Sequence, residues 1–121
     1  ETVIQVTAPS SLDVLEDLIQ KVIEPAALDV DREGTFPRTS IDALLGAGFG
    51  GLISATDVGG MGAGFDEASA VVRRLAAVCG STAMVYAMHL SGTAAIEQHY
   101  AVASAEPSQQ SVPAPAVEVS R

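Results

Sequence analysis

Residues 65–100, FDEASAVVRRLAAVCGSTAMVYAMHLSGTAAIEQHY, predict two consecutive helices and decide the fold. In the first half, apolar side chains recur at the three- and four-residue spacing of one helix face. These are Ala68, Val71, Val72, Leu75 and Cys79. Gly80-Ser81-Thr82 then indicates the end of one helix and the cap of the next. This next helix, expected over about residues 81–100, is apolar nearly all round, so we expect it to be buried or to await a partner.

Two further helices are expected upstream. Ser10, with Asp13 three residues later, is a variant of the capping box and predicts the start of the first helix. Pro25 removes a backbone donor within it, so a kink or break is expected there, and Gly34 provides a left-handed end. The second helix follows Pro37, which suits a first helical position. The apolar stripe of the first helix is Leu12, Leu15, Ile19, Val22, Ala26 and Val30.

Most of the eleven glycines lie in residues 46–64, which predicts a loop that could contain a very short extended piece at residues 51–53. Residues 46–51 satisfy the G-x-G-x-x-G pattern, but a dinucleotide site needs a strand before it, and here a helix precedes. Residues 59–64 have the composition of a phosphate loop without its Lys-Ser or Lys-Thr. We interpret them as a tight turn before the helix that starts near Phe65 or Asp66.

The predicted fold class is therefore all-α: an up-and-down helical bundle of about four main helices with a glycine-rich loop. We expect an extended lead-in over residues 1–9, the helical domain over 10–100, and a disordered tail rich in Pro and Ser over 101–121.

Composition excludes several classes of function. The 121-residue chain has a net charge of −9 and six basic residues, which argues against nucleic acid. Its single cysteine, Cys79, excludes an internal disulfide and is expected to be a buried structural thiol in a reducing, cytoplasmic compartment. Residues 75–96 carry no formal charge, but their polar and glycine breaks disfavour a membrane span.

The two histidines do not predict a metal site. His89 and His99 are ten residues apart, too far for one ion, and no further ligands stand at coordinating spacing. A packed or hydrogen-bonded histidine is expected at each. His89 is also a candidate for a ligand pocket, because Met84, Met88 and Ser91 lie within about one turn of it.

Three stretches carry a resemblance to a known family. They are Val22-Ile23-Glu24-Pro25-Ala26-Ala27 running into Asp31-Arg32-Glu33-Gly34-Thr35-Phe36-Pro37, then residues 44–52 continuing to Gly59-Gly60-Met61-Gly62, and the helix pair ending in Met88-His89-Leu90-Ser91. Their order and spacing resemble the N-terminal helical domain of the acyl-CoA dehydrogenases, in a truncated chain. Val58 stands where that family usually has an aromatic residue before the paired glycines.

The resemblance implies a flavoenzyme of fatty acid metabolism that dehydrogenates acyl thioesters at the α and β carbons. FAD would bind mainly to a middle β domain and a second helical domain of a homo-oligomer, and the carboxylate base would lie in or near the second helical domain. We expect this chain to lack both domains, and therefore to bind no cofactor and to be inactive unless they or a companion subunit are supplied. Its own share would be a wall of the acyl-chain cavity, for which we select Met84, Met88, His89, Ser91 and Thr93.

Two alternatives stay open. A flavin-dependent monooxygenase or oxidase would use the same helical domain and differ chiefly in its flavin site. A non-catalytic helical module would bind a partner through the apolar helix expected over residues 81–100.

Overall fold

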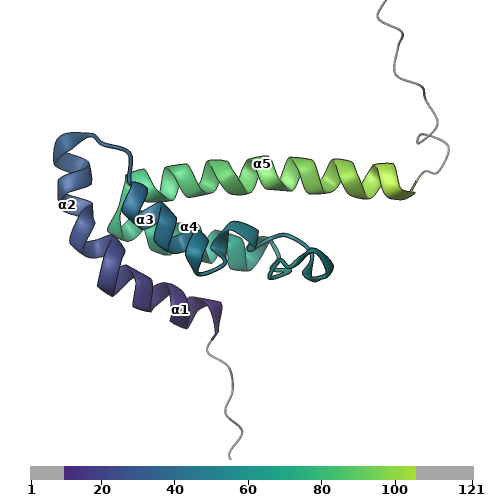
Figure 1. Cartoon of the computed structure of the whole chain (residues 1–121), viewed down its shortest axis with the longest axis horizontal. Coiled ribbons are helices and arrows are strands. Elements are labelled where there is room, and N and C mark those ends of the chain that lie inside the picture. The colour runs from purple at the N-terminus through teal and green to yellow at the C-terminus, as the bar shows by residue number, and fades with distance from the viewer. Residues whose placement is uncertain (1–9, 106–121) are drawn as a thin grey trace, which may run out of the picture.

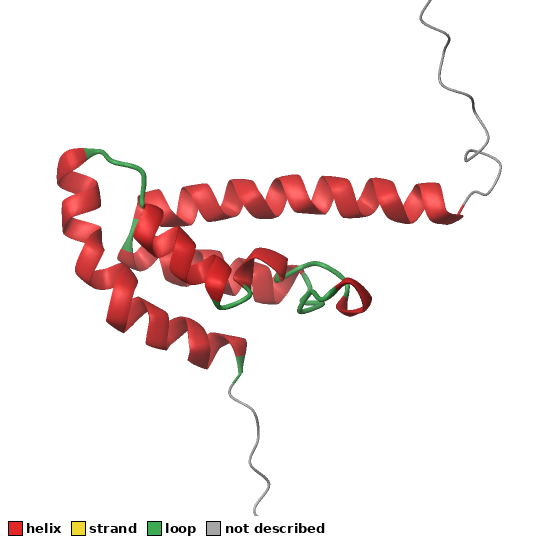
Figure 2. Ribbon diagram, viewed as in Figure 1, coloured by secondary structure: helices red, strands yellow, loops and turns green. Residues whose placement is uncertain are grey.

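The computed structural model describes residues 10–105, and every regular element within them is helical (Figures 1 and 2). The helices are α1 (Ser11–Leu18), α2 (Glu24–Glu33), α3 (Arg38–Gly46), α4 (Phe65–Val78) and α5 (Gly80–Ala105). A π-helical turn, Ile19–Ile23, joins α1 to α2 end to end, so the two form one bent rod. With this rod counted once, the described residues hold four main helices, and the predicted all-α class is confirmed.

The N-terminal rod begins at the predicted capping box. The Asp13 N–H donates to Ser10 Oγ at 3.2 Å, and the Ser10 N–H donates to Asp13 Oδ2 at 3.3 Å. The π turn ends two residues before Pro25, which has no N–H to bond to the carbonyl four residues back. The bend expected there is therefore present. Gly34, at φ 62°, ends the rod in the left-handed conformation as predicted.

The apolar stripe of this rod faces the core with one change of register. Leu15 and Ile19 are fully buried, as expected, but Ile23 rather than Val22 occupies the next core position. A π turn holds more residues than an α turn, so it shifts the inward direction by about one residue. Leu12, at the first turn, is exposed.

Two details between the N-terminal rod and α4 differ from their predictions. Pro37 stands at the N-cap of α3 rather than at its first helical position. The prediction of an extended piece at residues 51–53 is wrong, because a 3₁₀ turn, Phe49–Gly51, and further turns occupy this region. Leu52 has helical angles of φ −52° and ψ −47° and is fully buried. Burial of its side chain is thus achieved by turn geometry rather than by a strand. A second 3₁₀ turn, Thr56–Val58, follows.

α4 and α5 form an antiparallel hairpin joined at Cys79 (Figure 1). The predicted inner face of α4 is confirmed, since Val71 and Leu75 are fully buried and Cys79 is nearly so. The core between these helices, α3 and the N-terminal rod contains Leu15, Ile19, Ile23, Val30, Leu44, Phe49, Leu52, Val71, Leu75, Cys79, Ala83, Tyr86 and Leu90.

α5 departs from its prediction at its C-terminal end. It continues past Tyr100 to Ala105, so the disordered tail predicted from Ala101 is wrong for residues 101–105. The lead-in at residues 1–9 and the rest of the tail lie outside the described residues. Met84, Met88 and Ile96 on α5 are 64%, 60% and 72% exposed, so much of its apolar surface is not covered within the described chain. Among residues 10–105, no helix has the length and apolar character needed to cross a bilayer.

Candidate functional site

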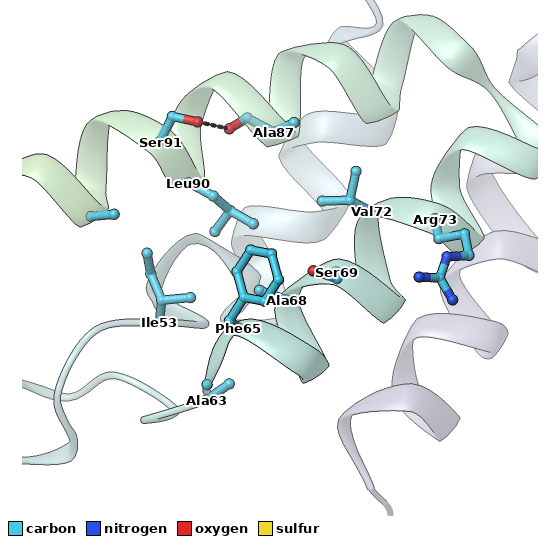
Figure 3. A pocket seen from close by; sticks show the side chains of 12 residues that line it. Ile53, Ala63, Phe65, Ala68, Ser69, Val72, Arg73, Ala87, Leu90 and Ser91 are labelled. Carbon is cyan, nitrogen blue, oxygen red and sulfur yellow. Dashed lines mark hydrogen bonds between the residues drawn. The ribbon is translucent and has the colours of Figure 1, made fainter.

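An open groove of about 610 Å³ runs between α4 and α5, with the glycine loop contributing to one end (Figure 3). It is lined by Ile53, Ala63, Gly64, Phe65, Ala68, Ser69, Val72, Arg73, Ala87, Leu90, Ser91 and Ala94. Most of these side chains are apolar, so the groove is suited to hold an apolar ligand of modest size.

Small side chains on both helices leave this space open. The lining residues that follow the spacing of one helical face are Phe65, Ala68, Ser69 and Val72 on α4, and Ala87, Leu90, Ser91 and Ala94 on α5. Alanine and serine are too short to span the gap between two helix backbones, which normally pack about 8–10 Å apart. The larger Val72 and Leu90 lie opposite one another as walls (Figure 3).

The groove contains one formal charge and no carboxylate. Arg73 lies at one end, whereas Ile53 and Ala63 lie at the other (Figure 3). The Ser91 hydroxyl donates to the Ala87 carbonyl at 3.0 Å, so it is already satisfied within its own helix. With no Asp, Glu, His or Cys in the lining, the groove offers no general base and no activated nucleophile. Its residues can bind an apolar group and exclude water.

Two side chains of α5 hold the glycine loop against the hairpin. The buried Tyr86 hydroxyl donates to the Phe49 carbonyl at 2.6 Å, and burial raises the pKa of Tyr86, so its phenol stays a donor. His89 Nε2 lies 2.7 Å from the Gly50 carbonyl oxygen. A carbonyl oxygen can only accept, so this nitrogen carries the proton. Since the loop supplies Ile53 and Ala63 to the groove, Tyr86 and His89 are positioning residues.

An ion pair on the opposite side of α4 fixes this helix against α1. Arg74 binds the Glu16 carboxylate through two guanidinium nitrogens. The hydrogen bond with Arg74 lowers the pKa of Glu16, and the same bond raises the pKa of Arg74. Ser11 also donates to Glu67 at the first turn of α4. These contacts hold the N-terminal rod against the helix that forms one groove wall.

The five residues selected from the sequence do not converge on one site. Only Ser91 lines the groove. Met84 and Met88 are exposed elsewhere on α5, and His89 bonds to the glycine loop. The Thr93 hydroxyl donates to the His89 carbonyl at 2.9 Å, one turn back in the same helix. The structure therefore does not unite them, because they occupy different faces of α5.

Most of the groove lining was missed by the sequence analysis. The signal was the repeat of small and apolar residues at spacings of three and four, at Ala87, Leu90, Ser91 and Ala94. The methionines and His89 are predicted from their position near the helix junction, but their side chains do not line this groove. Phe65 is 85% exposed. An aromatic side chain that stands at the start of a helix and does not pack into the core is a signal that indicates a groove residue.

The remaining motifs have structural roles. The first glycine motif follows α3 and the second ends at Gly64, directly before α4, so both loop interpretations are confirmed. Cys79 is buried and accepts a hydrogen bond from the Thr82 hydroxyl at 3.2 Å. It borders a second hollow, lined partly by Glu24 and Asp31 of α2. Within residues 10–105, no three His, Cys, Asp or Glu side chains cluster as a metal site would require.

Comparison with known proteins identifies the family. The family model described as "Acyl-CoA dehydrogenase, N-terminal domain" matches residues 10–114. Over 76 residues the chain is 34% identical to a protein of Mycobacterium leprae (strain TN) named "Probable acyl-CoA dehydrogenase fadE25". This match covers 63% of the chain but 20% of that relative, so the chain spans only about a fifth of the relative's length. No solved structure matches. Because the family model covers every helix of the described residues, the chain belongs to the acyl-CoA dehydrogenase N-terminal domain family.

Proposed function

We propose that this chain is the substrate-cavity domain of an FAD-dependent acyl-CoA dehydrogenase, and that the α4–α5 groove holds part of the acyl chain of a thioester. The observation that carries the proposal is the apolar groove itself, whose lining includes no carboxylate. Each methylene group transferred from water into such a groove contributes about 0.8 kcal/mol to binding. The chain's share of the function would be to bind, orient and exclude water.

The described residues do not fit a flavin dinucleotide. A pyrophosphate needs backbone N–H groups at a helix N-terminus or clustered basic side chains. The glycine turn before α4 leads into Asp66 and Glu67, whose carboxylates would repel it. The glycine motif after α3 has neither a preceding strand nor a following α-helix. We therefore propose that the flavin site and the catalytic base lie outside residues 10–105, and that the 121-residue chain alone does not oxidise thioesters.

A titration followed by two-dimensional NMR tests the groove. The ¹⁵N-labelled 121-residue chain would be titrated with the octanoyl thioester of N-acetylcysteamine, which is neutral and carries no phosphate. We expect the amide signals of Ala87, Leu90 and Ala94 to shift. Ala87→Phe would place a ring in the groove and abolish these shifts, whereas Ala95→Phe, at an exposed site on the same helix, would preserve them. Shifts confined to Met84 and Met88, or equal binding by both variants, would refute the proposal.

A flavin measurement tests the second part. The purified chain would be mixed with FAD and separated from free cofactor on a sizing column. We expect no flavin absorbance to travel with the protein. A stoichiometric amount of retained FAD, or thioester oxidation by this chain alone, would show that the cofactor site lies within it.

A second candidate is favoured by the exposed apolar surface of α5. Met84, Met88 and Ile96 form no part of the groove, yet all three are more than half exposed. Exposed apolar residues grouped on one helix are typical of an interaction surface. In a partner-binding module, Met88→Glu would abolish capture of the partner while leaving thioester binding in the groove unchanged. In a cavity domain without such a partner, Ala87→Phe rather than Met88→Glu would abolish the function, which is thioester binding in the groove.

A further inference from the structure

The α4–α5 groove has two chemically different ends. Ile53 and Ala63 make one end fully apolar, while Arg73 places a cation at the other (Figure 3). Ser69 lies four residues before Arg73, one helical turn away on the same face of α4, and also lines the groove. A ligand that fills this groove therefore meets a guanidinium group at one end and a hydroxyl one helical turn farther in (Figure 3).

Neither of these groups is bound to a carboxylate within the described chain. The salt bridges among residues 10–105 join Lys21 to Asp17 and Arg74 to Glu16. Arg73 has none there, and its side chain is exposed. The described hydrogen bonds include none from the Ser69 hydroxyl, unlike that of Ser91, which bonds to the Ala87 carbonyl. Two donors at the Arg73 end are thus free to bind an anion.

We infer that the groove accepts an acyl chain whose far end carries a carboxylate, which binds Arg73 and Ser69. This inference rests on the proposed function. A planar guanidinium matches a carboxylate in shape and charge and can bind it through two parallel hydrogen bonds. The methyl end of an ordinary fatty acyl chain would offer this end of the groove neither an acceptor nor a charge.

A phosphate of coenzyme A is less well matched to the same end. Phosphate groups carry more charge, and a site for several of them needs clustered basic side chains. Arg74, the neighbouring cation, is turned to the other side of α4 and neutralised by Glu16. The net charge of −9 also repels a polyanion. One guanidinium with one hydroxyl fits a singly charged carboxylate.

NMR titrations of the 121-residue chain with three probes test this inference. The probes are the octanoyl thioester of N-acetylcysteamine, the matching octanedioyl monothioester with a free carboxylate, and octanoyl-CoA. We expect the carboxylate probe to bind about five-fold tighter than its neutral counterpart, the upper range for an exposed ion pair. Added salt should reduce this preference. Arg73→Met should remove it, since methionine keeps an apolar stem without the charge. Arg38→Met removes an equal charge from an exposed arginine that lies over Phe36, and should retain the preference.

Each other result has a defined meaning. Equal binding of the neutral and carboxylate probes to the wild-type chain would overturn the inference but leave the proposed function standing. So would a carboxylate preference that survives Arg73→Met. If octanoyl-CoA binds tighter than its N-acetylcysteamine counterpart and Arg73→Met removes that gain, the cation serves the phosphates and the inference is wrong. If no probe shifts the groove signals, the proposed function fails and the inference with it.

Discussion

The hydroxyl of Tyr86 provides the most direct test of how the glycine loop is held. Its side chain is 2% exposed, and its single polar group donates to the Phe49 carbonyl at 2.6 Å. Tyr86→Phe removes this donor without changing the ring, and the Phe49 carbonyl then keeps only its bond from the Leu52 N–H at 3.2 Å. One hydrogen bond contributes about 0.5–1.5 kcal/mol net to stability, so we expect the free energy of unfolding to fall by about 1 kcal/mol.

Urea unfolding followed by circular dichroism measures this loss. For a small domain that loses about 1–3 kcal/mol of stability per molar urea, the midpoint should fall by about 0.5 M. Tyr100→Phe is the matched control, because Tyr100 is 68% exposed on the same helix. Its effect should stay within about 0.5 kcal/mol. If the two variants lose equal stability, the bond from Tyr86 does not hold the loop.

The same pair of variants tests a predicted pH dependence of the free energy of unfolding. Burial raises the pKa of Tyr86 above that of a tyrosine in the unfolded chain, which is about 10. The folded state therefore keeps its proton where the unfolded state has lost it, and stability falls as the pH rises past about 10. One group contributes at most about 1.4 kcal/mol per pH unit. This contribution should be absent from Tyr86→Phe and retained in Tyr100→Phe. Equal slopes between pH 9 and 11, by the same assay, would contradict a buried phenol.

Three further predictions concern stability and use the same unfolding assay. A Cβ added at Gly60 would overlap the Ser54 carbonyl, so Gly60→Ala should cost more than about 1 kcal/mol, whereas Gly64→Ala, with open space around it, should cost less. Leu75→Ala removes a fully buried side chain and should cost about 2–5 kcal/mol, against little for Leu28→Ala at an exposed site. The pKa of Glu16 is lowered by its hydrogen bond with Arg74. Its stabilising effect should therefore be present above the ordinary value of about 4.5 and be lost as the pH falls through the lowered pKa, so that wild type and Glu16→Gln converge in acid.

Local signals predicted the helices well, because each helix has ends encoded by a few neighbouring residues. Ser10 and Asp13 set the start of the first helix, and Gly34 set the end of the rod. The shift from Val22 to Ile23 in the core was not predictable from an α-helical period, since it depends on a π turn. The extended piece at residues 51–53 failed for a related reason. Short apolar runs between glycines bury their side chains in turns as readily as in strands.

The groove could not be predicted in the same way, because it depends on how two helices face one another. α5 is apolar nearly all round, so the spacing of its apolar residues does not indicate which side of the helix packs against α4. Met84 and Met88 were as plausible from spacing as Ala87 and Leu90 until the contact with α4 was known. The apolar face of α4, by contrast, was identified correctly, because charged residues mark its opposite side.

The small residues of the groove support a binding role over a purely structural one. Interior helix pairs are normally packed with few voids larger than a water molecule, and each buried methylene adds about 0.8 kcal/mol to stability. Larger side chains at Ala87 and Ala94 could fill part of this open space of about 610 Å³ and stabilise the hairpin. The chain forgoes this stabilisation while keeping Val71 and Leu75 tightly packed on the other face of α4. One face of α4 therefore borders open space while the adjacent face is fully packed, which is consistent with space kept for a ligand. Ala87→Phe, which places a ring in the groove, should therefore abolish thioester binding without lowering the stability of the fold.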